Sequence, residues 1–201
     1  LPPSRREPHG GRERQTDDAV LMLVTVSGEE FDESLARAES LILTDGLRPG
    51  HFKAALLGRL IGICGEVAAL RMLVALGVEA AWTGRDDWRA TDITTRNPRW
   101  TIDVKTSSRE AIDRYGIIIH CDHLPIVRRR SEVILWMVAD VPQYMPEIEV
   151  GRMSSIDIRD VGWIRSDEAN RFQRQNAGQG NRENYRIYRP YLSPIDALTN
   201  K

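Results

Sequence analysis

The chain has 201 residues, which suits one domain, or one domain with a tail, and leaves little room for two. Hydrophobic residues make up 41% and charged residues 28% of the sequence, as is typical of a globular protein with an ordinary core. The formal net charge of -1 excludes a globally basic, histone-like binder, but it leaves open a nucleic-acid enzyme whose active site is itself acidic.

The first part of the chain predicts a tail followed by one short and one longer element. Residues 1–18 lack large hydrophobic side chains after Leu1 and balance four arginines with four acidic residues, so we predict a flexible tail there. The apolar run at 19–26 indicates either a strand or the start of a helix. Apolar residues at helical spacing predict a helix over 29–45. We expect a single domain over 19–201.

A long hydrophobic helix follows residues 48–50 and ends before Gly77. Its last part, 54–76, carries only three charged residues, Arg59, Glu66 and Arg71. Three charges inside a membrane span would each cost about 2.5–3.5 kcal/mol at the bilayer centre, which argues against a membrane protein. Such an apolar helix is instead expected to be a central, nearly buried element.

The rest of the chain reads mainly as strands. Apolar runs, short loops and turn residues predict β-structure at 78–82, 91–95, 100–106, 116–121, 132–141, 146–153 and 185–189. The polar stretch at 173–184 predicts a loop, and 193–198 a short terminal helix. These elements predict an α/β fold with a central mixed β-sheet flanked by helices, with its core at about 50–141 and a C-terminal extension at 142–201.

The hairpin at 91–106 carries the candidate chemistry. Side chains alternate along a strand, so Asp103 and Lys105 share one face while Ile102 and Val104 face the core. A four-residue loop at 96–99 places Asp92 opposite Asp103. Directly opposed residues have Cβ atoms about 4.5–5.5 Å apart, so the register predicts two carboxylates side by side with a lysine two residues along.

Opposed like charges destabilise a sheet unless a cation joins them. Mg²⁺ binds carboxylates together with substrate phosphate oxygens, and the backbone carbonyl of Val104 could supply another ligand. The alternative is a surface ion pair between Asp103 and Lys105, with Asp92 at a strand entry. Only three of the 28 basic residues are lysines, so a surface cation would be expected to be arginine, and this favours a specific role for Lys105.

The pattern "TD" at 91–92 and "IDVKTSS" at 102–108 resembles that of the PD-(D/E)XK nuclease superfamily, which has the restriction-endonuclease-like fold. In that pattern an aspartate at a strand start is followed, after a variable gap, by an acidic residue, any residue and lysine. Many members carry a glutamate on the helix before the sheet, which Glu66 matches. Thr91 stands where the motif's name has proline. The resemblance covers about 50–141.

The resemblance implies metal-dependent hydrolysis of phosphodiester bonds, with DNA as the expected nucleic-acid partner. Asp92, Asp103, Glu66 and the Val104 carbonyl would hold Mg²⁺, for which Mn²⁺ could substitute. Lys105 would orient the attacking water or neutralise developing charge. A homodimer is left open. Two alternatives remain: a nucleic-acid-binding module that does not cleave, and an interaction protein of a phage or defence system. Glu66 could instead simply pair with an arginine of its own helix.

Other residues offer weaker signals. The cluster His120-Cys121-Asp122-His123 contains zinc-ligand types without a second pair nearby. We expect Arg128–Arg130 to lie in a loop, either solvated or holding a DNA backbone. Ser108 is expected to cap a helix rather than to bind phosphate. The arginines and tyrosines of 165–191 could contact nucleic acid or pack in the core. With two cysteines the chain is no disulfide scaffold, so we expect a cytoplasmic location.

Overall fold

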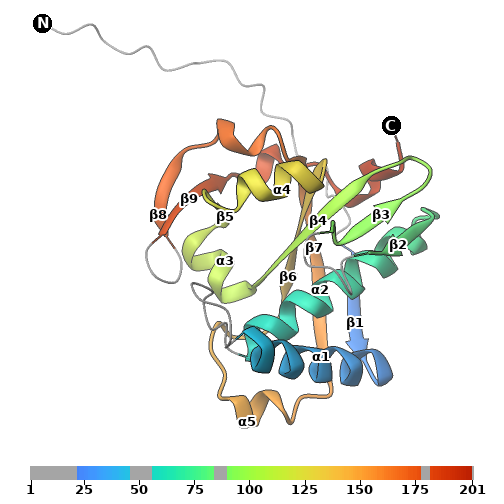
Figure 1. Ribbon diagram of the computed structural model, residues 1–201, viewed down its shortest axis with the longest axis vertical. Coiled ribbons are helices and arrows are strands. Elements are labelled where there is room, and N and C mark those ends of the chain that lie inside the picture. Colours follow the sequence, from blue (N-terminus) through green and yellow to red (C-terminus); the bar gives the residue numbers. More distant parts are fainter. Residues whose placement is uncertain (1–21, 46–55, 84–89, 178–181, 201) are drawn as a thin grey trace, which may run out of the picture.

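The computed structural model describes residues 22–45, 56–83, 90–177 and 182–200, so the predicted tail at 1–18 lies outside the described residues. A mixed six-stranded sheet runs through the molecule in the order β1-β7-β6-β4-β3-β2 (Figure 1). These strands are β1 (Leu23–Ser27), β2 (Ala80–Trp82), β3 (Ile93–Thr95), β4 (Thr101–Ser108), β6 (Val133–Ala139) and β7 (Ser155–Arg165). The predicted α/β class with a central mixed sheet is confirmed.

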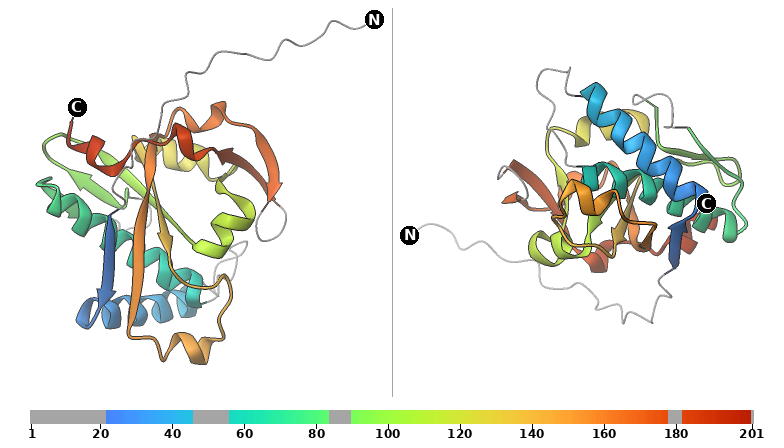
Figure 2. Two further views of the ribbon diagram at one scale, coloured as in Figure 1. Left: turned by 180° about the vertical axis from the view of Figure 1, so that it is seen from behind. Right: turned by 90° about the horizontal axis from the view of Figure 1, so that it is seen from below.

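Helices and a second, smaller sheet cover the large sheet. The long helix α2 (Leu56–Ala75) packs on β4 and its neighbours, and α1 (Glu29–Asp45) packs on α2 (Figures 1 and 2). The small sheet has the order β5-β9-β8. The remaining elements are β5 (Ile117–His120), β8 (Arg174–Ala177), β9 (Arg182–Ile187), α3 (Arg109–Tyr115), α4 (Leu124–Arg130), α5 (Glu147–Val150), and the 3-10 helices η1 (Ala169–Arg171), η2 (Arg189–Tyr191) and η3 (Ile195–Thr199).

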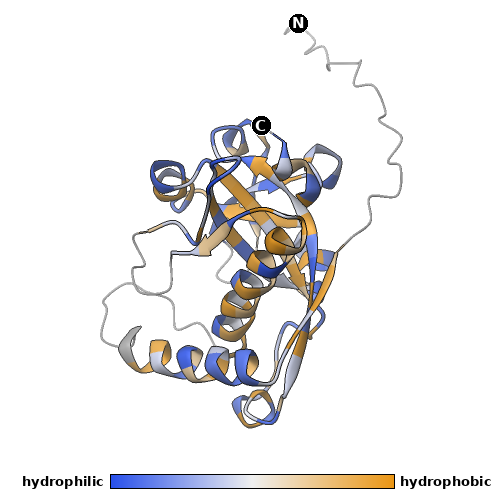
Figure 3. Ribbon diagram, turned by 90° about the vertical axis from the view of Figure 1, so that its right-hand side faces the viewer, coloured by the Kyte–Doolittle hydropathy of each residue, from blue (hydrophilic) through white to orange (hydrophobic). Residues whose placement is uncertain are grey.

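The large sheet separates two hydrophobic cores. All seven residues of β6 are buried, and their side chains alternate between the cores. Val133 and Leu135 join the core beneath α2, whereas Ile134 and Trp136 join a second core with β5, β9 and α4. A strand covered on both faces reads as a continuous hydrophobic run, which explains the sequence of this segment. Figure 3 shows hydrophobic residues, in orange, along strands in the interior of the molecule.

The helix α2 is the central buried element that its sequence predicts, with buried side chains on several sides. It approaches β4 very closely at Gly65, where an added Cβ would lie 1.8 Å from the Thr106 hydroxyl oxygen. A glycine is therefore required for this helix to rest on the strand. None of the helices in the described ranges combines the length and hydropathy of a membrane span.

Several predicted elements are wrong. The strand predicted at 146–153 is replaced by α5, and the loop predicted at 173–184 contains β8 and the start of β9. Polar side chains hold these two strands together: the Asn184 amide donates to the Ala177 and Arg182 carbonyls, and Arg174 binds Glu183 across the pair. The longest strand, β7, and the helix α3 were not predicted.

Candidate active site

The register of the β3–β4 hairpin is the predicted one. Ile93 pairs with Ile102, Thr94 with Thr101, and the Thr95 N–H donates to the Trp100 carbonyl at 2.9 Å. The pairing ends there: the Asp92 N–H donates to the Ile102 carbonyl at 3.1 Å, so the strands part before Asp92 can pair with Asp103.

The Asp92 carboxylate bends into the edge of β4. It accepts a hydrogen bond of 2.7 Å from the Val104 backbone N–H, instead of standing on the same face as Asp103, as the register alone predicts. The N–H and C=O of one strand residue point to the same side, so the Val104 carbonyl also faces this edge. The Asp92 carboxylate and the Val104 carbonyl, both expected from the sequence to bind a metal, therefore lie at the same edge of β4, where β3 no longer covers it.

Asp103 is fully buried and paired with two cations. It lies opposite Ile134, on the sheet face of the second core, and ion-pairs with the Lys105 ammonium and the Arg130 guanidinium. Lys105 and Arg130 keep 31% and 21% of their side chains exposed. The Asp103–Lys105 ion pair of the alternative interpretation is present, but its carboxylate is buried and not at the surface, where two cations offset the cost of burying its charge.

Glu66 reaches the site from the opposite face of the sheet. Its carboxylate accepts a hydrogen bond of 2.6 Å from the Trp82 indole N–H. Burial, and then the charge of Asp92, raises the pKa of Glu66 to about 7, against smaller opposing effects that include Lys105. Of the arginines on the same helix, Arg71 binds Glu30 at 3.2 Å. Glu66 thus interacts electrostatically with Asp92, from the sheet face opposite to that of Asp103.

Asp92 stands between the other two carboxylates. Its pKa is raised, first by burial and then by the charge of Asp103, while Lys105 and the Val104 N–H act in the opposite direction. The charge of Asp103 therefore raises the pKa of Asp92, and the charge of Asp92 raises the pKa of Glu66.

The donor types of this group fit a hard divalent cation, which prefers carboxylate and carbonyl oxygens. Their present arrangement is closed: no three His, Cys, Asp or Glu side chains in the described ranges stand ready to hold an ion together. The Asp103 oxygens face Arg130 and Lys105, and an Asp92 oxygen faces the Val104 N–H. A metal fits the chemistry of the site, and binding one requires some of these contacts to be exchanged.

Sequence reasoning missed the contribution of α4. Arg130 lies at the end of this helix and not in a loop, 27 positions after the aspartate that it binds. At the other end of α4, His123 contacts His120 with ring centroids 5.1 Å apart. Burial lowers the pKa of His123, and His120 and then Lys105 lower it further. Ser108 caps α3 by accepting a hydrogen bond from the Ala111 N–H at 3.2 Å, so its capping interpretation is confirmed.

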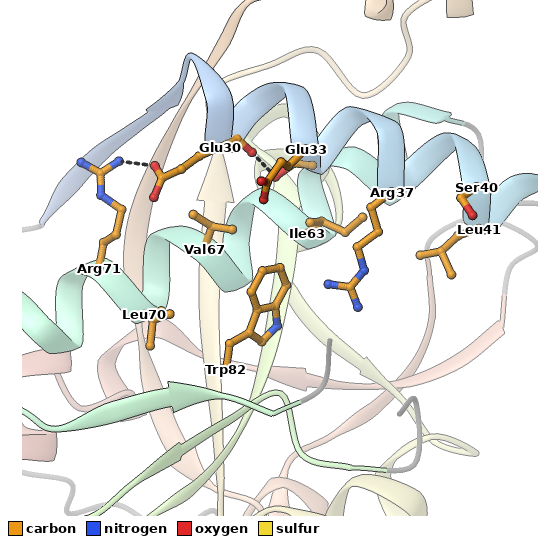
Figure 4. Close-up of a pocket in the computed structure, with 11 residues that line it drawn as sticks. Glu30, Glu33, Arg37, Ser40, Leu41, Ile63, Val67, Leu70, Arg71 and Trp82 are labelled. Carbon is orange, nitrogen blue, oxygen red and sulfur yellow. Dashed lines mark hydrogen bonds and ion pairs between the residues drawn. The ribbon is translucent and has the colours of Figure 1, made fainter. Parts of the chain in front are cut away.

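A cavity among the described residues is separate from this group. It has a volume of about 570 Å³ and lies between α1, α2 and β2 (Figure 4). Trp82 stands in it beneath Arg37, whose guanidinium lies 4.8 Å from the indole centroid. Asp92, Asp103 and Lys105 do not line the cavity, whereas Trp82, which donates to Glu66, does.

No protein-family model, curated protein or solved structure matches this chain. The resemblance to PD-(D/E)XK nucleases rests on the residues and spacing of the sequence.

Proposed function

We propose that this protein is a metal-dependent nuclease with a restriction-endonuclease-like core, which hydrolyses phosphodiester bonds, with DNA as the expected substrate. The observation that carries the proposal is the gathering of Asp92, Asp103 and Lys105 at one parting of two strands, with Glu66 from the preceding helix beside them. These are the positions at which the superfamily pattern has its acidic residues and its lysine.

The residues divide into metal ligands and one cation. Asp92, Asp103, Glu66 and the Val104 carbonyl would hold Mg²⁺, or Mn²⁺ in its place. When bound, the ion lowers the pKa of a coordinated water and stabilises charge on the scissile phosphate. Each carboxylate neutralises part of the ionic charge, and their mutual repulsion in the metal-free protein adds to the affinity for a cation.

Lys105 supplies the positive charge that meets the substrate. Its ammonium lies beside the buried Asp103 carboxylate and is still 31% exposed, so it is accessible to a bound phosphate. A lysine in this position orients a water molecule or neutralises the negative charge that develops on the phosphate. In the metal-free protein Arg130 forms an ion pair with Asp103, and a metal that binds Asp103 must displace it.

A second candidate is a nucleic-acid-binding module that does not cleave. The closed state of Asp103 favours it, because a carboxylate that stays bound to Lys105 and Arg130 serves structure and needs no metal. Both candidates bind nucleic acid, but only the nuclease cleaves the bound strand.

The two candidates are separated by incubating the protein with plasmid, linear duplex, single-stranded and branched DNA, and with RNA, in Mg²⁺, Mn²⁺ or EDTA. The nuclease predicts cleavage of at least one substrate, dependent on the metal and lost in Asp103→Asn. Binding without cleavage in either metal supports the second candidate. A cytoplasmic location and a homodimer stay predictions from the sequence.

A further inference from the structure

A second cavity lies on the sheet face that carries Asp103. It has a volume of about 270 Å³, and Val138 near the end of β6 contributes to its wall. Second-core residues of β5 and β9, Ile117 and Ile187, line it as well. Val138 pairs with Ser107, four residues beyond Asp103 on β4, so the cavity lies about 13 Å along the strand from the buried aspartate.

Four arginines line this cavity: Arg109, Arg159, Arg186 and Arg189. Two of them share a carboxylate, since Asp140 binds Arg109 at 3.1 Å and Arg159 at 3.7 Å. Arg186 contacts a neutral amide, that of Gln175, at 3.4 Å.

Two acidic residues also line the cavity, Asp113 and Asp160. Asp160 is 3% exposed, and its carboxylate accepts the Met22 N–H at 2.6 Å. Together with Asp140, which binds two of the arginines, three carboxylates lie near the four guanidinium groups. The Asp160 carboxylate already accepts a backbone hydrogen bond. The cavity keeps an excess of positive charge and fork-shaped donors, which suits a phosphate.

Exposed aromatic rings lie beside these arginines. Tyr188, which also lines the cavity, is 41% exposed, and the Arg186 guanidinium lies 5.7 Å from its ring centroid. Phe172 packs against Tyr188 and against Tyr191, with centroids 6.5 and 5.5 Å apart. Aromatic rings next to arginines are the combination on which nucleic-acid bases stack in a sequence-tolerant way.

We propose that this cavity binds one nucleotide unit, with its phosphate on Arg186 and Arg189 and its base against Tyr188. The assignment of that nucleotide to a substrate strand rests on the proposed nuclease function. At a stacked spacing of about 3.4 Å per nucleotide, the separation along β4 corresponds to about four nucleotides. A free nucleotide and a nucleotide within a strand both offer a phosphate and a base, so the experiment includes both.

The test is fluorescence anisotropy of a labelled twelve-nucleotide single-stranded DNA in EDTA, where cleavage and the metal site play no part. We expect the Kd to rise about tenfold or more in Arg186→Ala, Arg189→Ala and Tyr188→Ala. Tyr188→Phe should keep most of the affinity, because it keeps the stacking ring. Arg152→Ala, an exposed arginine outside the cavity, should stay within about twofold of the wild type.

Competition with deoxyadenosine monophosphate distinguishes the two sources. Displacement of the labelled strand shows that a free nucleotide suffices, whereas a strand that stays bound shows that the site requires the polymer; both outcomes support the proposal if the cavity variants weaken binding. Thermal melts confirm that each variant folds. Unchanged affinity in both arginine variants, or an equal loss in Arg152→Ala, would overturn it. Binding of this kind, together with no cleavage of any substrate in Mg²⁺ or Mn²⁺, would refute the nuclease and leave the cavity site standing.

Discussion

The Asp103 carboxylate has two opposing effects on the stability of the acidic site. The fold removes this carboxylate from water and surrounds it with Lys105 and Arg130, which offsets the cost of burying its charge. The same carboxylate raises the pKa of Asp92, so it also adds to the repulsion within the acidic group. Since the two cations contact Asp103 directly, we expect their attraction to outweigh the repulsion in the metal-free protein.

Substituting Asp103→Asn tests this balance. The variant leaves two partly buried cations without their carboxylate, so the free energy of unfolding in EDTA should fall by about 1–3 kcal/mol. Urea denaturation measures the change, with the exposed Asp113→Asn as the control. A variant as stable as the wild type, or more stable, would show that repulsion with Asp92 dominates instead.

Glu66 gives the fold a dependence on pH with a definite sign. Its pKa is about 7 in the folded protein and 4.5 in its unperturbed state, so the folded state holds the proton more tightly. Stability is therefore lost as pH rises from about 4.5 to 7, by at most about 3 kcal/mol from this group.

Glu66→Gln should remove that loss while keeping an acceptor for the Trp82 indole. We expect the variant to match the wild type near pH 4.5 and to exceed its unfolding free energy by about 1–3 kcal/mol at pH 8 in EDTA. Chemical denaturation across this pH range provides the measurement, with Glu39→Gln, at an exposed position of α1, as the control. A difference between variant and wild type that does not change with pH would contradict the assigned pKa.

At the scale of elements, the hairpin could be predicted and the polar strands could not. Alternating side chains and a four-residue loop determine the register of the hairpin, which the structure shows as far as the pair Ile93 and Ile102. The pair β8–β9 offers no such signal, because its strands are held by Arg174, Glu183 and the Asn184 amide. Arg130 could not be assigned either, since its approach to Asp103 depends on the parallel pairing of β4 with β6, which draws α4 over the strand.

The contact between α2 and β4 should be intolerant of a single methyl group. In Gly65→Ala the added Cβ would overlap the Thr106 side chain, so the free energy of unfolding should fall by about 1–3 kcal/mol or more. Gly62→Ala is the matched control on the same helix, because nothing lies within 4 Å of its added Cβ, and it should gain about 0.5–1 kcal/mol. Equal stability of the two variants would contradict the close approach.

At the scale of the whole molecule, the site lies where the two cores meet the edge of a strand. Glu66 reaches it from the α2 side and Arg130 from the α4 side, while Asp92 lies at the edge between them. The sequence predicts the class of fold and the four acidic and basic residues of the pattern. It does not predict that the face of Asp103 is covered, because that cover comes from β5, β9 and α4, which follow β4 in the chain.

In the proposed nuclease, the acidic group binds a metal while Lys105 serves the hydrolytic step. The most direct measurement is single-turnover cleavage by the wild type and Lys105→Ala, with Mn²⁺ titration of both proteins. We expect Lys105→Ala to slow cleavage about 10²–10⁴-fold while Mn²⁺ affinity largely persists. Lys105→Arg should rescue poorly, since its guanidinium is planar and always protonated. Full activity in Lys105→Ala, or a wild type that binds no Mn²⁺ and cleaves no nucleic acid, would contradict this proposal.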